Sequence, residues 1–247
     1  MPVDSMLIRE RYKVVRVLWT QPDYALVEAV DIQERETPTC LINLYEGGLM
    51  HRYGRLCGRI RQEDCPALRE AFLENGTLAV VFDDARGESI DAAFYRGDRW
   101  KWQDRLEFAG LVMYQALLLA NLPPEISCAV LLSDNLLVDT AERKVRLRYM
   151  LRPMGEMTAR EPALLACDQL RKILPWQFSA GKAEQAFRRR LEQGDFPSIV
   201  PMYSAWRQAE ADIRAEREKF RKANPVRRGF TMLWRGIRRL WERGRQL

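Results

Sequence analysis

The chain has 247 residues, 47% apolar and 30% charged, which is typical of a soluble globular protein large enough for one two-lobed domain. Its five cysteines form no C-x-x-C pair and it has a single histidine, which argues against a zinc site, a disulfide framework and a histidine-based triad. Arg207 to Leu247 holds thirteen Arg and Lys against five Asp and Glu, a net charge of +8, so the rest of the chain carries −2 of the total of +6. The basic character therefore belongs to the C-terminal tail, and binding of nucleic acid by the whole protein is not indicated.

The first third of the chain predicts strands, because segments rich in Val, Leu and Tyr alternate there with polar turns. One helix is expected among these strands, and it is rich in arginine. In chain order we expect strands at Tyr12 to Leu18, Tyr24 to Asp31 and Cys40 to Tyr45, a helix over Leu49 to Arg61, and a strand at Thr77 to Asp83 after Asn75-Gly76.

The rest of the chain predicts helices, with a loop and two short strands between them. The first helix has long apolar periodicity and should stop at Pro123-Pro124, since proline cannot continue a helix. Expected helices cover Asp104 to Asn121, Glu161 to Phe178, Lys182 to Gln193 and Ser204 to Lys222.

Neither the N-terminal segment nor the longest apolar stretch predicts secretion or membrane spanning. Met1 to Glu10 mixes charged residues with few apolar ones, unlike a signal peptide. The longest apolar stretch, Phe108 to Leu122, is interrupted by Gln115 and is shorter than the roughly 20 residues that a bilayer requires. We therefore expect a cytoplasmic protein with reduced thiols.

The segment from Cys128 to Leu151 carries the strongest functional signal. It reads C-A-V-L-L-S-D-N-L-L-V-D, and after a turn V-R-L-R-Y-M-L. This frame resembles the catalytic loop of a protein kinase, H-R-D-L-x-x-x-N, followed by two short strands and D-F-G. The resemblance extends over roughly Tyr12 to Gly181 and implies an α+β fold with a strand-rich lobe and a helical lobe.

The charged positions of that frame are replaced in this chain. In the resemblance, Asn43 takes the place of the strand lysine, Val130 that of the catalytic aspartate and Tyr149 that of the metal-binding aspartate, while Asn135 is retained. A neutral amide, an aliphatic group and a phenol cannot supply the charges that triphosphate and Mg²⁺ need. The resemblance therefore implies a pseudokinase that has no catalytic residues, binds no cofactor and binds no metal.

Other parts of the frame agree with this interpretation. The turn Trp19 to Ala25 has no glycine where kinases place a glycine-rich loop, and the predicted helix from Leu49 to Gln62 has no Glu or Asp to pair with a lysine. Asp168 resembles the aspartate that braces the catalytic loop, although it is equally well read as a helix-surface acid. The segment between Leu151 and Glu161 is short for a peptide-docking platform.

The tail predicts a cationic amphipathic helix. Its apolar residues recur at helical spacing and fall on one face, and arginines fill most of the other positions. Such a helix suits the surface of an anionic membrane or an acidic partner; the alternative is a helix packed on the core of the domain itself. The expected contact residues are Arg227, Arg228, Phe230, Leu233, Trp234, Arg235, Ile237, Arg238, Arg239, Leu240 and Trp241.

We therefore predict three regions: a strand-rich lobe over residues 1–85, a helical lobe over 86–205, and a charged helix with a basic tail over 206–247. The predicted function is a catalytically inactive scaffold or regulatory protein-binding module. By analogy it is similar to the cytoplasmic pseudokinase domain of YukC/EssB-type components of bacterial type VII secretion, or to bacterial membrane-linked Ser/Thr kinases that have lost activity. Two rivals remain open, namely a nucleotide-dependent transferase whose charges have moved, for instance to Asp134 or Asp139, and a tail that binds nucleic acid.

Overall fold

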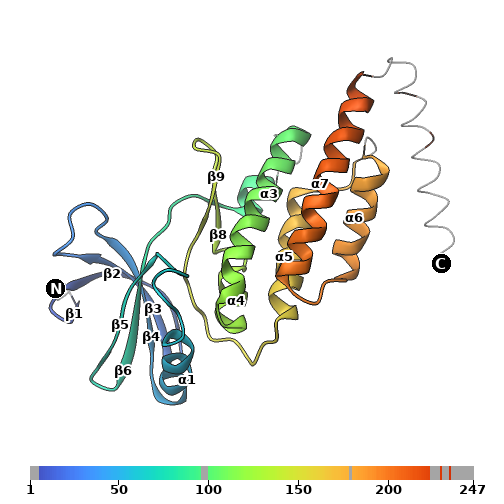
Figure 1. The fold of residues 1–247 in the computed structure, drawn as a ribbon. Helices are drawn as coiled ribbons and strands as arrows, with labels where there is room; N and C mark the ends of the chain where they lie inside the picture. The colour runs from blue at the N-terminus through green and yellow to red at the C-terminus, as the bar shows by residue number, and fades with distance from the viewer. Residues whose placement is uncertain (1–5, 96–99, 178–179, 223–228, 230–233, 235–247) are drawn as a thin grey trace.

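The computed structural model describes residues 6–95, 100–177, 180–222, 229 and 234. A strand-rich lobe is followed by a helical lobe, and the two meet along one side of the sheet (Figure 1). The elements of the first lobe are β1 (Leu7–Ile8), β2 (Tyr12–Gln21), β3 (Tyr24–Asp31), β4 (Thr39–Tyr45), α1 (Gly47–Cys57), β5 (Leu68–Glu74) and β6 (Thr77–Asp83).

The strands form one antiparallel sheet in the order β1-β2-β3-β4-β6-β5. The central strands β4 and β6 are apolar along most of their length and are buried on both faces. One face, with Leu41 and Phe82, belongs to the large core shared with the helices, while the other, with Ile42 and Val81, belongs to a smaller core. Because β4 lies in the middle of the sheet, any side chain at its centre is held in a fixed position.

The smaller core is closed by the curl of the sheet. Tyr12 of β2 packs its ring on Phe72 of β5 at 6.4 Å between centroids, and its hydroxyl bonds to Glu70. Arg11 forms a bidentate ion pair with the buried Asp31 at 2.7 and 2.9 Å. These contacts draw the two ends of the sheet together, so that the face opposite the helices is covered.

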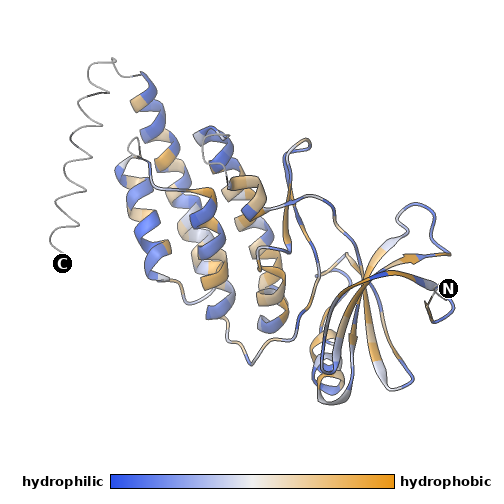
Figure 2. Cartoon of the chain, turned by 180° about the vertical axis from the view of Figure 1, so that it is seen from behind, coloured by the Kyte–Doolittle hydropathy of each residue, from blue (hydrophilic) through white to orange (hydrophobic). Residues whose placement is uncertain are grey.

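The helical lobe contains seven helices and a small sheet of order β7-β8-β9 within the described residues. In Figure 2 its helices carry both hydrophobic and hydrophilic stretches, as expected of amphipathic helices packed around a shared core. Its elements are β7 (Glu88–Ser89), α2 (Ile90–Phe94), α3 (Trp102–Leu118), η1 (Leu119–Asn121), α4 (Pro124–Val130), β8 (Leu136–Asp139), β9 (Lys144–Leu147), α5 (Arg160–Ile173), α6 (Lys182–Gln193) and α7 (Ile199–Lys222).

The predicted strands are confirmed in kind, with corrections at their ends. β2 continues to Gln21 instead of ending at Leu18, because it pairs with β3 up to the tight turn at Pro22-Asp23. The strands β1 and β5 were not expected. The helix predicted over Leu49 to Arg61 starts earlier and ends at Cys57, since the amides of Arg59 and Ile60 bond three residues back in tight turns.

The predicted helices need three corrections. The first predicted helix does stop before Pro123-Pro124, as α3 followed by η1, but Pro124 also opens the unexpected helix α4, where a missing amide has no cost at the first helical position, so Cys128 to Val130 are helical and not in a loop. Helix α5 ends at Ile173 and not at Phe178, because Leu174 precedes Pro175 and leaves the helical conformation. Helix α7 begins at Ile199, so the boundary predicted at residue 205 lies inside it. None of the described helices is both long enough and apolar enough to cross a bilayer.

Candidate functional site

Asn43 occupies the centre of β4, opposite Leu26 of β3 and Val80 of β6, and is fully buried. Its side-chain oxygen accepts hydrogen bonds from the Tyr24 hydroxyl at 3.0 Å and from the Leu151 amide at 2.8 Å. Its side-chain nitrogen donates to the carbonyl of Tyr149 at 3.0 Å. The residue in the predicted lysine position is therefore bound to the segment that follows β9 in the helical lobe.

That segment, Tyr149 to Gly155, has no regular secondary structure and receives further contacts from the first lobe. The Tyr45 hydroxyl donates to the Leu151 carbonyl at 2.7 Å, and the Met154 amide donates to the Tyr53 hydroxyl at 3.0 Å. Arg52 of α1 donates to the Gly155 carbonyl at 2.7 Å. We call Tyr149 to Gly155 the strap, because its backbone groups are bonded by side chains of β4 and α1.

The tyrosines that hold the strap form a buried stack. The rings of Tyr45 and Tyr53 are nearly parallel with centroids 4.2 Å apart, and Tyr24 lies 5.2 Å from Tyr45. Burial raises the pKa of the Tyr45 phenol well above its ordinary value. These hydroxyls therefore stay protonated and serve as neutral hydrogen-bonding groups.

Tyr149, in the predicted metal-binding position, is a core residue. Its ring stacks on Phe82 of β6 with centroids 4.8 Å apart and an interplanar angle of 6°. Burial raises the pKa of the phenol, and a hydrogen bond with Cys65 acts in the same direction. The side chain therefore contributes packing between the lobes.

Val130 and Asn135 lie on either side of the loop that leads from α4 to β8. Val130 is the last residue of α4 and is fully buried, so it contributes to the core. Asn135 is also buried and donates to the carbonyls of Ala129, at 2.8 Å, and Met150, at 3.0 Å. Its amide oxygen accepts from the Met150 amide at 3.3 Å. Asn135 thus ties the loop to the strap, which agrees with a loop-structuring role.

Arg152 connects three elements at the edge of the interlobe contact. Its guanidinium lies 4.7 Å from the ring centroid of Trp19 on β2 and forms an ion pair with Asp134 at 2.7 Å. Asp134 belongs to the loop before β8, and its side chain is 61% exposed. The glycine-free turn of the first lobe is therefore joined through the strap to the loop of the second.

The bracing residue beneath this loop is Gln169 and not Asp168. The Asp168 side chain is 45% exposed and pairs with Arg171 at 2.6 Å, so of the two interpretations of this residue its contacts support the helix-surface acid. The buried Gln169 donates to the Leu131 carbonyl at 3.0 Å and accepts from the Ser133 hydroxyl at 3.3 Å. The two residues are adjacent, but only one of them faces inward on α5.

Asp139 has a structural role in the turn between β8 and β9. Its carboxylate accepts from the amides of Ala141, at 3.1 Å, and Glu142, at 2.9 Å. These backbone hydrogen bonds lower its pKa, the one from Glu142 most strongly. Among the described residues, no group of three or more His, Cys, Asp or Glu is placed to hold a metal ion.

Most of the predicted tail contacts lie outside the described residues, including Arg227, Phe230, Leu233 and the residues from 235 onward. Trp234 is described, and it is 65% exposed. The tail contacts therefore stay a prediction.

Sequence reasoning placed Asn43, Asn135 and Tyr149 but missed the residues that join them. Tyr24, Tyr45, Tyr53 and Arg152 read as ordinary strand, helix and loop residues. Nothing in the local pattern predicts that the hydroxyls of Tyr45 and Tyr53 meet a segment about 100 residues away.

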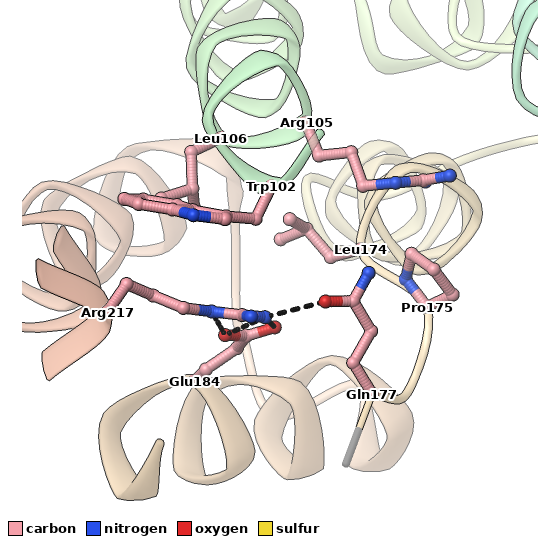
Figure 3. Close-up of a pocket in the computed structure, with 8 residues that line it drawn as sticks. All are labelled: Trp102, Arg105, Leu106, Leu174, Pro175, Gln177, Glu184 and Arg217. Carbon is pink, nitrogen blue, oxygen red and sulfur yellow. Dashed lines mark hydrogen bonds and ion pairs between the residues drawn. The ribbon is translucent and has the colours of Figure 1, made fainter. Parts of the chain in front are cut away.

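A small pocket lined by both apolar and charged residues lies in the helical lobe, away from the strap (Figure 3). Arg217 of α7 reaches into it, pairs with Glu184 of α6 through two bonds of 2.7 Å, and donates to Gln177 at 2.9 Å. Trp102 of α3 lies over the guanidinium at 5.8 Å. The group joins α3, α6 and α7 around one buried ion pair.

Comparison of the chain with known proteins shows its fold. No protein-family model and no curated protein matches the sequence. Among solved structures, the Mycobacterium tuberculosis PknI kinase domain matches with a TM-score of 0.52 and 12% identity, covering 83% of this chain and 98% of that domain. A double mutant of the same domain matches with a TM-score of 0.51 and 13% identity, covering 88% and 100%. At this identity the likeness concerns the fold alone, and the chain has the two-lobed α+β fold of a protein kinase domain.

Proposed function

We propose that this protein is a pseudokinase, a kinase-fold protein without phosphotransferase activity that serves as a scaffold or regulatory binding module. The proposal rests on the hydrogen bonds of Asn43, the residue in the predicted lysine position. Its side-chain oxygen and nitrogen are both bonded within the protein, to Tyr24 and the strap, and the residue is fully buried. Phosphoryl transfer depends on positioning and charge neutralisation, and Asn43, Val130 and Tyr149 supply no charge.

The strap strengthens the proposal. In a kinase the corresponding region must present an aspartate to metal, whereas here Tyr149 packs on Phe82 and its carbonyl is bonded to Asn43. To free this region for a nucleotide, several buried hydrogen bonds between the lobes would have to break. Each broken bond leaves a buried polar group that costs about 1 to 3 kcal/mol.

The test is the response of the full chain to nucleotide. Thermal unfolding is recorded with ATP alone, with Mg²⁺ alone and with both, next to phosphate release and autophosphorylation assays. The proposal expects no metal-dependent rise in the unfolding midpoint and no turnover. Turnover that is lost in an Asp134→Asn variant would establish the rival instead, because Asp134 is the exposed carboxylate of the loop.

We further propose that the tail brings the domain to an anionic surface at the inner face of a membrane. Trp234 belongs to the predicted apolar face and is 65% exposed, so its indole is accessible to a lipid surface. The YukC/EssB analogy belongs to this proposal, since those pseudokinase domains are linked to membranes.

Vesicle sedimentation tests the role of the tail. The full chain and a chain ending at Lys222 are mixed with vesicles of anionic lipid, of neutral lipid, and with duplex DNA across a salt series. We expect binding to anionic vesicles that needs the tail and the tryptophan, so that Trp234→Ala weakens it. Binding to duplex with a steep salt dependence, at the expense of vesicles, would instead favour a nucleic-acid arm.

A further inference from the structure

The outer half of β2, Val15 to Gln21, has less support than the rest of the sheet. At the inner end of the strand, β1 pairs with Tyr12 and Lys13, and the Val14 amide bonds to the Met6 carbonyl. From Val15 onward, β3 is the only neighbouring strand in the part of the chain that the structure describes. The outer half of β2 is therefore paired on one side only.

The pairing of this half with β3 is also irregular. The register shifts between Val14 and Arg16 and again between Val17 and Trp19, and each such bulge leaves a residue outside the ladder. Every residue of the outer half except Leu18 is exposed. Segments with few buried apolar contacts and exposed backbone hydrogen bonds open locally at a smaller free-energy cost than core strands such as β4.

Arg152 of the strap joins this half to the rest of the molecule. Its guanidinium lies 4.7 Å from the ring centroid of Trp19. In the described chain, no other ion pair, ring contact or side-chain hydrogen bond links the outer half of β2 to an element other than β3. Leu18 adds apolar packing against the large core. Without the Arg152 contact, the strand would be held by β3 and Leu18 alone.

An exposed ion pair directs the Arg152 side chain. Asp134, in the loop before β8, pairs with the guanidinium at 2.7 Å. The Arg152 and Asp134 side chains are 29% and 61% exposed, so dissolved salt weakens their attraction. The contact with Trp19 therefore depends in part on ionic strength.

The backbone around Arg152 is held by the buried tyrosines. Tyr45 donates to the Leu151 carbonyl, and the Met154 amide donates to Tyr53. These bonds lie on either side of Arg152 in the chain, so they fix the point from which its side chain extends. The guanidinium is in place for the strand only while the strap is bound.

We propose that Arg152 is a latch that couples the strap to the outer half of β2. While the tyrosines bind the strap, Arg152 stacks on Trp19 and holds the strand. When the strap leaves, the strand loses this contact and opens as a local unit, so an event that displaces the strap is transmitted to the end of the sheet. This inference goes beyond the proposed function, because it concerns a motion of the fold and holds whether or not the protein turns over nucleotide.

Amide hydrogen exchange of the full chain, followed by NMR without nucleotide, tests the latch. Arg152→Ala should speed the exchange of the amides between Val17 and Gln21 that bond to β3 by about two- to fivefold, because an exposed cation–π contact is lost. Asp134→Asn should have a smaller effect. It should also remove the acceleration that about 1 M salt causes at these amides in the wild type.

Tyr53→Phe tests the coupling through the strap. The change removes the hydroxyl that bonds the Met154 amide, and Tyr53 lies on α1, away from β2 in the chain. The amides between Val17 and Gln21 should again exchange faster. The control is Glu184→Ala, which breaks the buried ion pair with Arg217 in the helical lobe. It should speed the exchange of core amides, which needs global unfolding, and leave the outer half of β2 unchanged.

Three outcomes would overturn the proposal. Unchanged exchange at the outer half in Arg152→Ala would show that there is no latch. Acceleration of core amides alone in Tyr53→Phe would show that the strap does not transmit its release to the strand. Equal acceleration of the outer half and of the buried Ile42 in Glu184→Ala would show that the outer half opens only when the whole chain unfolds. No readout involves nucleotide, so failure of the latch is distinguishable from the discovery of ATP turnover.

Discussion

At the scale of single residues, Asn43 contributes more to stability than its size suggests. It is the only side chain described here that bonds both Tyr24 and two backbone groups of the strap. Replacing it leaves the Tyr149 carbonyl and the Leu151 amide buried without these partners. In a two-lobed protein this links the position of the strap directly to the centre of the sheet.

Asn43→Ala is therefore expected to lower the free energy of unfolding by about 3 kcal/mol. The control is Asn121→Ala, since Asn121 is exposed and makes one bond of 3.2 Å to Asp64. That change should cost less than about 0.5 kcal/mol. Urea unfolding of both variants measures the difference, and equal losses would contradict the role assigned to Asn43.

The buried cysteines predict an alkaline limit to stability. Burial raises the pKa of Cys57 and of Cys128 to about 12. Unfolded thiols lose their protons near pH 8.5, so above that pH the unfolded state binds fewer protons than the folded state. Their contribution to stability is thus complete below about pH 8.5 and is lost as the pH rises toward about 12.

The unfolding midpoint is therefore expected to fall between about pH 8.5 and pH 11. The fall should be smaller in Cys57→Ala than in the wild type, compared as midpoint differences so that the packing cost of the substitution cancels. A thiol reagent provides the second measurement. Rapid reaction of a cysteine in the native protein near pH 8 would show that its thiolate is accessible and that the argument fails.

At the scale of elements, the ion pair between Glu184 and Arg217 fixes α6 against α7 (Figure 3). The two side chains are only 8% and 6% exposed, so a charge left alone there cannot be solvated. Glu184→Ala should lower the free energy of unfolding by about 3 to 5 kcal/mol. Glu218→Ala, which breaks an exposed pair with Arg221 on the same helix, should cost about 0.5 kcal/mol or less. Similar losses in chemical denaturation would mean that Arg217 finds other solvation.

An element could be predicted when the sequence signal for it lies within the element, and was missed when the element depends on pairing with another segment. Helix α6 has the predicted bounds, because helical periodicity and the glycine at position 194 are local signals. Strand β5 was missed because Arg69, Glu70 and Glu74 interrupt its apolar residues, and its strand form comes from pairing with β6 across the Asn75-Gly76 turn. The stop predicted at Pro123-Pro124 is correct, but helix α4 was missed because a proline that ends one helix can also occupy the first position of the next.

The candidate site was predictable in its positions but not in its contacts. The frame around Asn135 and the strands β8 and β9 identified the positions that correspond to the catalytic loop and D-F-G of a kinase, because the spacing between them is local. The bonds from Asn43 and Tyr45 to the strap join residues more than 100 positions apart, which no local pattern encodes. That Gln169 and not Asp168 bonds the loop was likewise not predictable, because the packing of α5 decides which of its residues face inward.

At the scale of the whole molecule, the two lobes share one core. The large hydrophobic cluster runs without interruption from Leu26 and Leu41 of the sheet to Ile213 of α7. The hydrogen bonds of the strap cross the same boundary. Domains joined by a small polar interface often unfold separately, whereas a shared apolar core couples their stabilities.

The chain is accordingly expected to unfold in a single transition, despite its two-lobed shape. Far-ultraviolet circular dichroism follows mainly the helical lobe, and a variant retaining Trp19 as its only tryptophan reports on the sheet through fluorescence. Because Trp19 is 45% exposed, its signal should change when Arg152 and the strap leave it. Both probes should give the same urea midpoint, and Asn43→Ala should shift both together. If the sheet lost its signal at lower urea than the helices, the lobes would be independent units and the strap a weak tether between them.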